Sequence, residues 1–342
     1  MGKKKEKCGA MNKRKGKLNK EWKVPLTIPE IDSLLEELNK KTKENQESSV
    51  SDLYDKQKMG DHLHHQINDI TVQIKNIFDD IRKEEKIQRR TIDGIQAEIV
   101  PVIQEAARIP DIYYLFEEMQ SKNEYTYKHN IGVGIIATYL GKKLGLSSES
   151  LSNLTLAATL HDVGKTRIPE SLLDKPGKLT LAEYEEMKRH TIYGYELLKN
   201  IPGLHPSIAL TALQHHERED GHGYPLNLNG NNIYYLSKIV AIADVFHAMS
   251  SNRVYHQAMP FYMVIEQMNR DVFGKFNPGI LLVFINSLME TLVGKEVVLT
   301  NQQIGTIIMI NPYDPLKVLM KTDAGFVDLR MEKELQIERI IS

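Results

Sequence analysis

The fold of this chain is decided by HDVGK at residues 161–165 and by HHEREDGHGYP at residues 215–225. Three more residues that can bind a metal, His129, His190 and Asp244, stand before, between and after these two stretches. Successive groups lie 25 to 32 residues apart. Such intervals place each group near the end of a different helix, and a helical bundle can turn all of them inward.

Residues 121–293 carry the signals of a run of helices. Ser148 is a candidate N-cap. Thr180 and Glu183 form a capping box, which indicates a helix that begins there and continues to about Asn200. The expected helices cover 127–144, 148–162, 180–200, 206–217, 236–251, 261–272 and 279–293. This segment is therefore expected to fold as a helical bundle.

The segments on either side differ in their apolar period. Residues 28–120 read as a helical N-terminal segment, because apolar residues such as Ile70, Ile74 and Ile81 recur at helical spacing. In residues 294–342 short strands are expected at 297–300, 305–310, 318–321, 326–329 and 337–341. The predicted fold class is mainly α, a helical bundle with a helical N-terminal segment and a small C-terminal β subdomain.

The composition disfavours several classes of protein. The chain has 342 residues, of which 41% are hydrophobic and 26% are charged, as in ordinary soluble globular proteins. Its only cysteine, Cys8, cannot form an internal disulfide. No stretch approaches the roughly 18 consecutive apolar residues of a membrane span, and the basic N-terminus lacks the apolar core of a signal peptide. We therefore expect a cytoplasmic protein.

Basic residues gather at the start of the chain. Residues 1–23 carry ten basic and two acidic side chains, and the remaining 319 residues carry 34 basic and 43 acidic ones. A basic tail could touch nucleic acid or anionic lipid, but a nucleic-acid function requires a basic face on the folded part, which the sequence does not show. We expect residues 1–27 to form a disordered tail, and we expect no nucleic-acid partner.

The candidate metal ligands are His129, His161, Asp162, His190, His215, His216 and Asp244. Imidazoles and carboxylates without thiolates favour cations such as iron, manganese, zinc, nickel or cobalt. Seven ligands exceed what one tetrahedral zinc uses, and they suit two metals with a bridging carboxylate. Two metals about 3.5–4 Å apart can hold a hydroxide, clamp a phosphate and stabilise a leaving oxygen. The residues thus predict metal-assisted hydrolysis of a phosphoester.

The chain resembles the HD-GYP domain, a branch of the HD phosphohydrolase superfamily. The resemblance lies in an HD pair (His161-Asp162), an HH pair (His215-His216) and Gly223-Tyr224-Pro225, which follow one another in this order. The resemblance covers residues 121–275, somewhat less than half of the chain. It implies an HD-type helical bundle with a metal centre. It also implies hydrolysis of cyclic dinucleotides, chiefly cyclic di-GMP, in bacterial second-messenger signalling.

By position, the resemblance implies two sets of metal ligands, namely His129, His161, Asp162 and Asp244 for one ion and His190, His215 and His216 for the other. Asp162 would bridge the two ions. Some family members hold a third metal with a glutamate four residues before the first histidine, and that position here is Tyr125. Two metal ions, iron or manganese, are therefore expected.

The resemblance also implies contacts with the substrate. Lys165 would neutralise phosphate charge or assist the leaving oxygen. Gly223, Tyr224 and Pro225 would form a loop against the ligand, where glycine permits close backbone approach and the tyrosine stacks on a guanine or hydrogen-bonds to it. Arg253 would bind phosphate through its guanidinium fork, and His256 stands where the family often has a second basic residue.

Two positions depart from the family pattern. His256 is only partly charged near neutral pH, which predicts weaker phosphate binding and a steeper pH dependence than arginine would give. His247 stands where the family commonly has aspartate, three residues after Asp244, and such a neighbour can tune metal affinity. These departures keep open a drift towards a receptor without catalytic activity.

The sequence therefore predicts a phosphodiesterase that hydrolyses cyclic di-GMP to linear pGpG, to GMP, or to both. A metal-bridging hydroxide would attack the phosphate, with Asp162 and Lys165 as catalytic residues. One alternative is a slow or non-catalytic receptor for a cyclic dinucleotide. Another is an HD phosphohydrolase that acts on a different cyclic dinucleotide or on a nucleotide. The N-terminal helices are a candidate interface for a homodimer.

Overall fold

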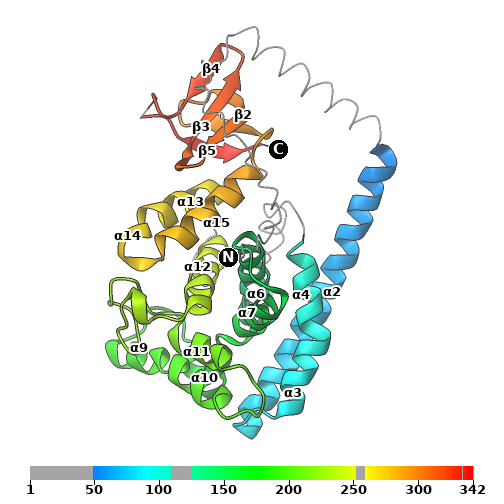
Figure 1. Cartoon of the computed structure of the whole chain (residues 1–342), viewed down its shortest axis with the longest axis vertical. Helices are drawn as coiled ribbons and strands as arrows, with labels where there is room; N and C mark the ends of the chain where they lie inside the picture. Colours follow the sequence, from blue (N-terminus) through cyan, green and yellow to red (C-terminus); the bar gives the residue numbers. More distant parts are fainter. Residues whose placement is uncertain (1–48, 109–124, 252–258, 333, 342) are drawn as a thin grey trace, which may run out of the picture. The chain divides into compact units, whose positions relative to one another are not determined.

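The computed structural model describes residues 49–108, 125–251, 259–332 and 334–341 (Figure 1). The chain divides into two compact units, residues 1–61 and residues 62–342. Of the first unit only the start of one helix is described, and the predicted tail over 1–27 lies outside the described residues. The second unit contains the helical bundle and the β-sheet, which confirms the predicted fold class.

The predicted N-terminal helical segment is mostly helical where it is described. It consists of α2 (Ser49–Glu84), α3 (Arg89–Gly94), a π-helical turn η1 (Ile95–Ile99) and α4 (Val100–Ala106). The apolar stripe predicted on α2 is confirmed, because Ile70, Ile74, Phe78 and Ile81 are all buried. These side chains join the same hydrophobic core as the central helices.

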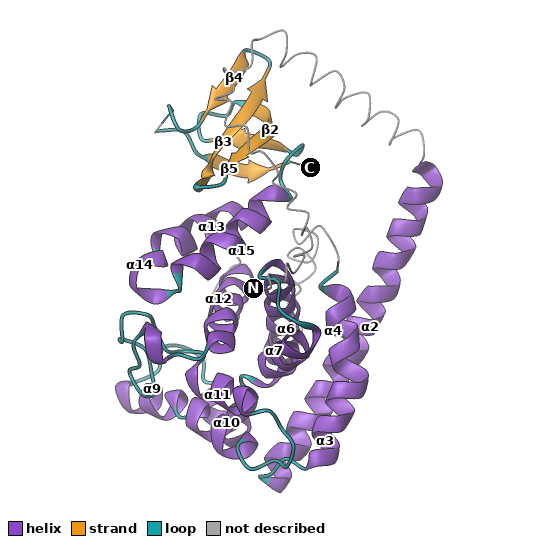
Figure 2. Cartoon of the chain, viewed as in Figure 1, coloured by secondary structure: helices purple, strands orange, loops and turns teal. Residues whose placement is uncertain are grey.

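The centre of the bundle is built from α6 (Tyr125–Lys143), α7 (Ser148–Leu160), α10 (His190–Leu198), α11 (Pro206–Gln214) and α12 (Tyr235–Ser250). Helix α6 packs against α7 and α12, and α11 packs against α7 and α10 (Figure 2). The N-cap of α7 is Ser147, whose hydroxyl accepts from the Ser150 amide, so the prediction of Ser148 as the cap is wrong by one residue.

The predicted helix over 180–200 is two helices, α9 (Leu181–Lys188) and α10, which meet at Arg189. The capping box of Thr180 and Glu183 is confirmed at the start of α9. The break follows from side chains that satisfy the last carbonyls of α9. The Nδ1 of His190 lies 2.8 Å from the Met187 carbonyl, and the Thr191 hydroxyl donates to the Lys188 carbonyl. The break places His190 at the start of its own helix.

The helical part also contains η2 (Val163–Arg167), α8 (Glu170–Leu173), η3 (Gly230–Asn232), α13 (Phe261–Arg270), α14 (Val272–Lys275) and α15 (Pro278–Glu290). The predicted helices over 206–217, 236–251, 261–272 and 279–293 are confirmed to within three residues at each end. Among the described residues, no helix combines the length and the apolar character that crossing a membrane requires.

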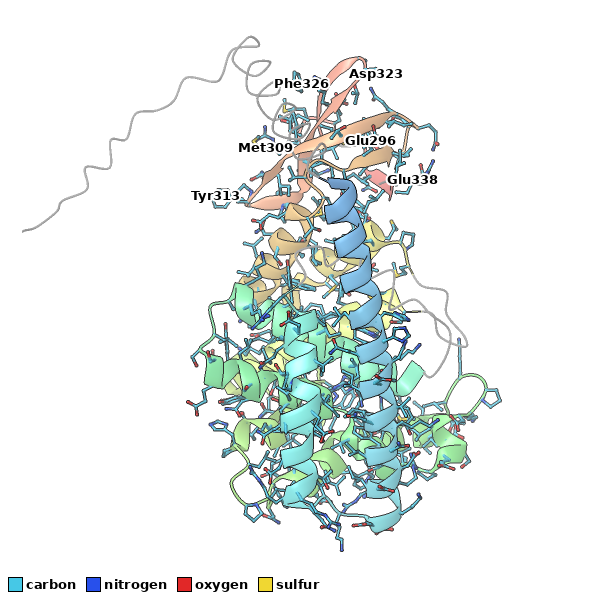
Figure 3. All side chains as sticks on the ribbon, turned by 90° about the vertical axis from the view of Figure 1, so that its right-hand side faces the viewer. Glu296, Met309, Tyr313, Asp323, Phe326 and Glu338 are labelled. Atoms are coloured by element: carbon cyan, nitrogen blue, oxygen red, sulfur yellow. The ribbon has the colours of Figure 1, made fainter. Side chains whose placement is uncertain are left out.

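The five predicted strands are confirmed as β1 (Glu296–Leu299), β2 (Ile304–Asn311), β3 (Asp314–Thr322), β4 (Gly325–Asp328) and β5 (Ile337–Ile340). They form one antiparallel sheet in the order β4-β3-β2-β1-β5. One face of the sheet packs towards α13 and α15, where the Tyr262 hydroxyl donates to the Leu316 carbonyl. Met309, Tyr313 and Phe326 are exposed on the outside of the sheet (Figure 3).

Candidate metal centre

The structure brings all seven predicted metal ligands together inside the bundle. Each comes from a helix or a helix end: His129 from α6, His161 and Asp162 from the end of α7, His190 from the start of α10, His215 and His216 from the end of α11, and Asp244 from α12. All are buried except His216, whose side chain is 28% exposed. His216 is therefore the predicted ligand that is most exposed to solvent.

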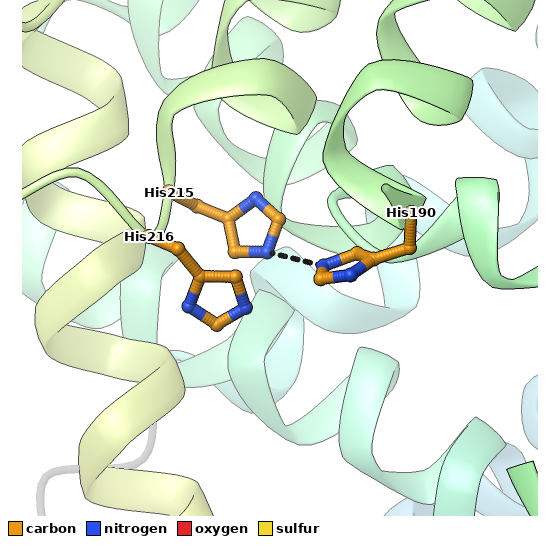
Figure 4. A group of neighbouring side chains, drawn as sticks. All are labelled: His190, His215 and His216. Atoms are coloured by element: carbon orange, nitrogen blue, oxygen red, sulfur yellow. Dashed lines mark hydrogen bonds between the residues drawn. The ribbon is translucent and has the colours of Figure 1, made fainter. Parts of the chain in front are cut away.

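His190, His215 and His216 form a cluster of three imidazoles (Figure 4). The Nε2 atoms of His190 and His215 lie 3.3 Å apart, and the ring centres of His215 and His216 are 4.1 Å apart. The Nδ1 atoms of His190 and His215 lie against carbonyls at the ends of α9 and α11. A neutral ring that donates from Nδ1 keeps a lone pair on Nε2, so both lone pairs point to the same place.

His129, His161 and Asp162 form a second cluster. The Asp162 Oδ2 lies 3.4 Å from the Nε2 of His161 and 3.8 Å from the Nε2 of His129. The His161 Nδ1 lies 2.7 Å from the carbonyl of Ala158, which leaves its Nε2 directed at the carboxylate. The Asp244 Oδ1 lies 3.1 Å from the His129 Nε2. This cluster has the nitrogen and oxygen donors that a divalent cation uses.

Asp162 lies between the two clusters. Its Oδ1 is 3.4 Å from the His190 Nε2 and 3.8 Å from the His215 Nε2, while its Oδ2 faces His129 and His161. Asp244 also reaches both sides, because its Oδ2 lies 3.9 Å from the His216 Nδ1. A carboxylate with one oxygen towards each cluster has the arrangement of a bridging ligand.

The protonation states of the site suit a cation. Burial lowers the pKa of His190 to about 3 and that of His216 to about 4, so both rings are neutral at pH 7. Burial alone would raise the pKa of Asp162, but Lys165 and His161 hold it well below its usual value. Asp162 therefore carries its negative charge beside the neutral ring of His190, and this carboxylate raises the pKa of His161 in spite of its burial.

Two buried atoms at the centre of the site, the His161 Nε2 and the Asp162 Oδ1, have no hydrogen-bond partner among the described residues. A buried polar atom without a partner costs free energy, and coordination to a bound ion removes that cost. Both atoms face other donor atoms of the clusters. The residues present therefore fit bound metal ions.

Lys165 stands beside the clusters on the short helix η2. Its ammonium pairs with the Asp162 Oδ2 at 2.5 Å, and its side chain is 28% exposed. Gly164, just before it, packs so closely on α10 that an added Cβ would lie 1.9 Å from the His190 carbonyl oxygen. Glycine is thus required for the HD turn to approach the helix that carries His190.

The loop with Gly223, Tyr224 and Pro225 closes over the three-histidine cluster. The Tyr224 ring stacks on His216, with ring centres 4.7 Å apart and an interplanar angle of 29°. A Cβ on Gly223 would lie 2.5 Å from the Glu217 Cα, so this position requires glycine. The buried Glu217 carboxylate holds the loop by accepting from the backbone amides of Leu226 and Leu228. Sequence reasoning missed this role, because nothing nearby in the sequence identifies the partners of Glu217.

His247 lies behind His129. Their Nδ1 atoms are 3.0 Å apart, and the Ser251 hydroxyl lies 3.1 Å from the same atom of His247. Gly132 makes room for the ring, since a Cβ there would lie 2.1 Å from the His247 Nε2. The sequence placed His247 near Asp244 on α12, and the structure shows that it also reaches His129 on α6.

Sequence reasoning also missed Lys188. Its ammonium lies 5.7 Å from the centre of the Tyr224 ring, over the loop that closes the site. In the sequence, only its position two residues before His190 indicates that Lys188 lies near the site. Two predicted substrate contacts, Arg253 and His256, lie outside the described residues.

Comparisons with known proteins give a family match and several similar sequences. The model of the HD domain family matches residues 104–278, just over half of the chain. The chain is 49% identical over 124 residues to the cyclic di-GMP phosphodiesterase response regulator RpfG of Xanthomonas campestris, covering 36% of this chain and 33% of that one. It is 38% identical over 154 residues to 3′3′-cGAMP-specific phosphodiesterase 1 of Vibrio cholerae, covering 45% of this chain and 36% of that one. The chain thus spans about a third of the length of these relatives.

One solved structure has a similar fold, namely Bd1817, an HDG"Y"P protein from Bdellovibrio bacteriovorus. The TM-score is 0.51 at 18% identity, covering 65% of this chain and 71% of that one. At this identity the likeness concerns the fold.

Proposed function

Because the chain belongs to the HD domain family, we propose that it is a metal-dependent phosphodiesterase that hydrolyses cyclic di-GMP. The observation that carries this proposal is the pair of buried ligand clusters joined by Asp162. Its relatives support the substrate class, because one is named a cyclic di-GMP phosphodiesterase and another a 3′3′-cGAMP-specific phosphodiesterase.

Two divalent metal ions, iron or manganese, would occupy the two clusters. The proposed sets are His129, His161, Asp162 and Asp244 for one ion and His190, His215 and His216 for the other, with Asp162 shared. The distances from Asp162 to residues of both sets support the sharing. Bound metals would supply an activated water and neutralise charge on the phosphate.

The chain's own residues would bind and orient the dinucleotide. Lys165 would place its ammonium beside the scissile phosphate, where positive charge stabilises the transition state. Tyr224 has one ring face against His216, which gives it a fixed orientation for stacking on a guanine. Arg253 and His256 are proposed to contact phosphate as well.

The reaction breaks one phosphorus–O3′ bond of the cyclic dinucleotide. The oxygen of water adds to phosphorus, and the O3′ atom leaves with a proton, which gives linear pGpG. Cleavage of the second phosphodiester in the same way gives two GMP. Cyclic GMP–AMP is a second candidate substrate, because one relative is named for it.

The test uses protein that is purified without oxygen and whose metal content is measured. The protein is incubated with cyclic di-GMP and, separately, with cyclic GMP–AMP, with and without added Mn²⁺ or Fe²⁺, and the products are separated by chromatography. Linear dinucleotide or GMP at about two metals per chain supports the proposal. Tight binding of the dinucleotide without any product would show a receptor instead.

A pair of histidine variants makes this test specific. His216→Ala removes a proposed ligand, and we expect loss of one metal and of hydrolysis. His64→Ala removes an exposed histidine of α2 and should leave both unchanged. Equal activity of the two variants would contradict the proposed centre. The predicted homodimer stays a prediction, which light scattering on the full chain would check.

A further inference from the structure

The C-terminal end of α2 contacts the turn that follows the HD pair. The guanidinium of Arg82 donates to the Ile168 carbonyl at 3.0 Å and to the Lys165 carbonyl at 3.4 Å. Its Nε also lies 3.6 Å from the carboxylate of Glu170, at the start of α8. One side chain of the N-terminal segment thus reaches both ends of the segment from Lys165 to Ile168.

This turn is also held from its opposite side. Gly164 lies against α10, where an added Cβ would be 1.9 Å from the His190 carbonyl oxygen and 2.4 Å from the Gly194 amide nitrogen. On the side of α2, the buried Phe78 and Ile81 fix the helix to the core. The η2 turn therefore lies between two helices, and a shift of either one changes its position.

Arginine suits this position for a chemical reason. The last carbonyls of a helix have no partner within the helix. The Lys165 carbonyl accepts from the Ile168 amide, and Arg82 adds a second donor to it and a donor to the Ile168 carbonyl. A guanidinium can donate to two carbonyls at once in a fixed plane, whereas a lysine ammonium has no such planar fork. The side chain of Arg82 is 27% exposed, so its bonds are partly protected from competition by water.

We propose that Arg82 is a positioning residue that holds the backbone at Lys165, so that α2 sets the orientation of the Lys165 ammonium at the metal centre. The backbone carbonyl of Lys165 is held by Arg82, while its ammonium lies beside Asp162. The inference rests on the proposed function, because it assigns to Lys165 a role in hydrolysis. It adds that a movement of α2 would change catalysis without any contact between α2 and the substrate.

The first test is Arg82→Gln in the full, metal-loaded chain. We expect kcat to fall about tenfold with KM changed less than about twofold, because a small displacement of a group that acts by its position lowers the rate. The metal content should stay that of the wild type. Arg82→Lys keeps the charge and one donor and should recover part of the rate. An unchanged kcat in Arg82→Gln would overturn the proposal.

A double-mutant cycle with Lys165→Met shows whether Arg82 acts through Lys165. If it does, Arg82→Gln has little further effect once the ammonium is gone. Full additivity of the two losses would overturn the proposal.

Arg167→Gln is the matched control. Arg167 lies on the same turn and bonds to the Glu85 carbonyl at 3.1 Å and to Glu196 at 3.2 Å. It joins the η2 turn to the residue that follows α2 and to α10, without contacting the Lys165 carbonyl. We expect its kcat to stay within about twofold of the wild type. A loss equal to that of Arg82→Gln would show that docking of α2 in general matters, and would refute the specific role of Arg82.

A readout independent of activity separates this inference from the proposed function. The Ile168 amide donates to the Lys165 carbonyl at 3.1 Å, so its hydrogen exchange reports the order of the turn. Arg82→Gln should accelerate this exchange, and Arg167→Gln should do so less. A wild-type chain that hydrolyses neither dinucleotide would refute the proposed function, whereas unchanged exchange in Arg82→Gln would refute the positioning role.

Discussion

The helical bundle and the β-sheet both bury apolar side chains, but in the parts that the structure describes only the bundle also buries a group of histidines and aspartates at its centre. Within the described residues, the bundle buries five histidines, His129, His161, His190, His215 and His247, together with Asp162 and Asp244. The sheet buries apolar side chains such as Ile307, Val318 and Met320, and Thr322 is the one buried polar residue that its described strands contribute.

This difference separates a region built for chemistry from one built for packing. Burying a charge or an unpaired polar atom costs free energy, whereas burying an aliphatic side chain stabilises the fold. The buried histidines and aspartates at the centre of the bundle carry this free-energy cost, and bound metal ions would compensate it. Substitutions of the clustered ligands should therefore change activity more than stability, and those of the buried sheet residues should do the reverse.

Asp162→Ala should have the largest effect on activity. It removes the carboxylate that lies between the two clusters, so we expect hydrolysis to fall by at least about 10³-fold and metal content to fall with it. The measurements are turnover of cyclic di-GMP and metal analysis on the same sample.

Asp93→Ala is the control for that loss. Asp93 is an exposed aspartate that pairs only at the surface with Arg89 in the contacts described for it, and we expect wild-type activity. Wild-type turnover in Asp162→Ala would contradict both the mechanism and the view of the bundle interior as a catalytic region.

Gly164→Ala is expected to be an exception in the bundle, because it should lower stability. Position 164 lies next to the metal centre but serves the packing of the HD turn on α10. The new methyl group would meet backbone atoms of α10, which cannot move independently of the helix. We expect the free energy of unfolding to fall by about 4 kcal/mol, measured by denaturant titration.

Gly94→Ala is the matched control for this clash. A Cβ there meets nothing within 4 Å, and alanine should be neutral or should stabilise the protein by up to about 1 kcal/mol. Equal stability of the Gly164 and Gly94 variants would refute the close approach of the HD turn to α10.

Ile307→Ala tests the sheet. Ile307 is fully buried on β2, so its truncation should lower the free energy of unfolding by about 3 kcal/mol. The kcat of the folded fraction should stay unchanged. Ile304→Ala on the same strand, where the side chain is 53% exposed, should cost less than about 1 kcal/mol. A lower kcat in folded Ile307→Ala would show that the sheet also supports the site.

The same comparison explains what the sequence could predict. Helices, strands and the convergence of the seven ligands follow from local period, capping residues and motif order, which neighbouring residues determine. The break at Arg189 was missed because it depends on His190 and Thr191 bonding back to α9. The contacts of Arg82 and His247 join residues 83 and 118 positions apart in the sequence, and only the packing of the helices brings them together.

His247→Asp should have the smallest of the expected effects. It tests whether a buried residue next to a metal ligand tunes the metal centre. The His247 ring lies against the Nδ1 of His129, which must carry a proton when the Nε2 of His129 binds a metal. A carboxylate is a stronger acceptor for that proton than a neutral imidazole, and it adds one negative charge beside the centre. We expect metal affinity to rise about tenfold, measured by competition with a chelator.

His247→Asn separates the effect of charge from the effect of size. Asparagine has nearly the shape of aspartate and can accept a hydrogen bond, but it brings no charge, so it should leave metal affinity within about threefold of the wild type. If both variants bind metal equally, the contact between His129 and His247 contributes only packing. If the aspartate variant alone gains affinity, the negative charge of a carboxylate next to His129 strengthens metal binding, and the wild-type centre lacks that charge at position 247.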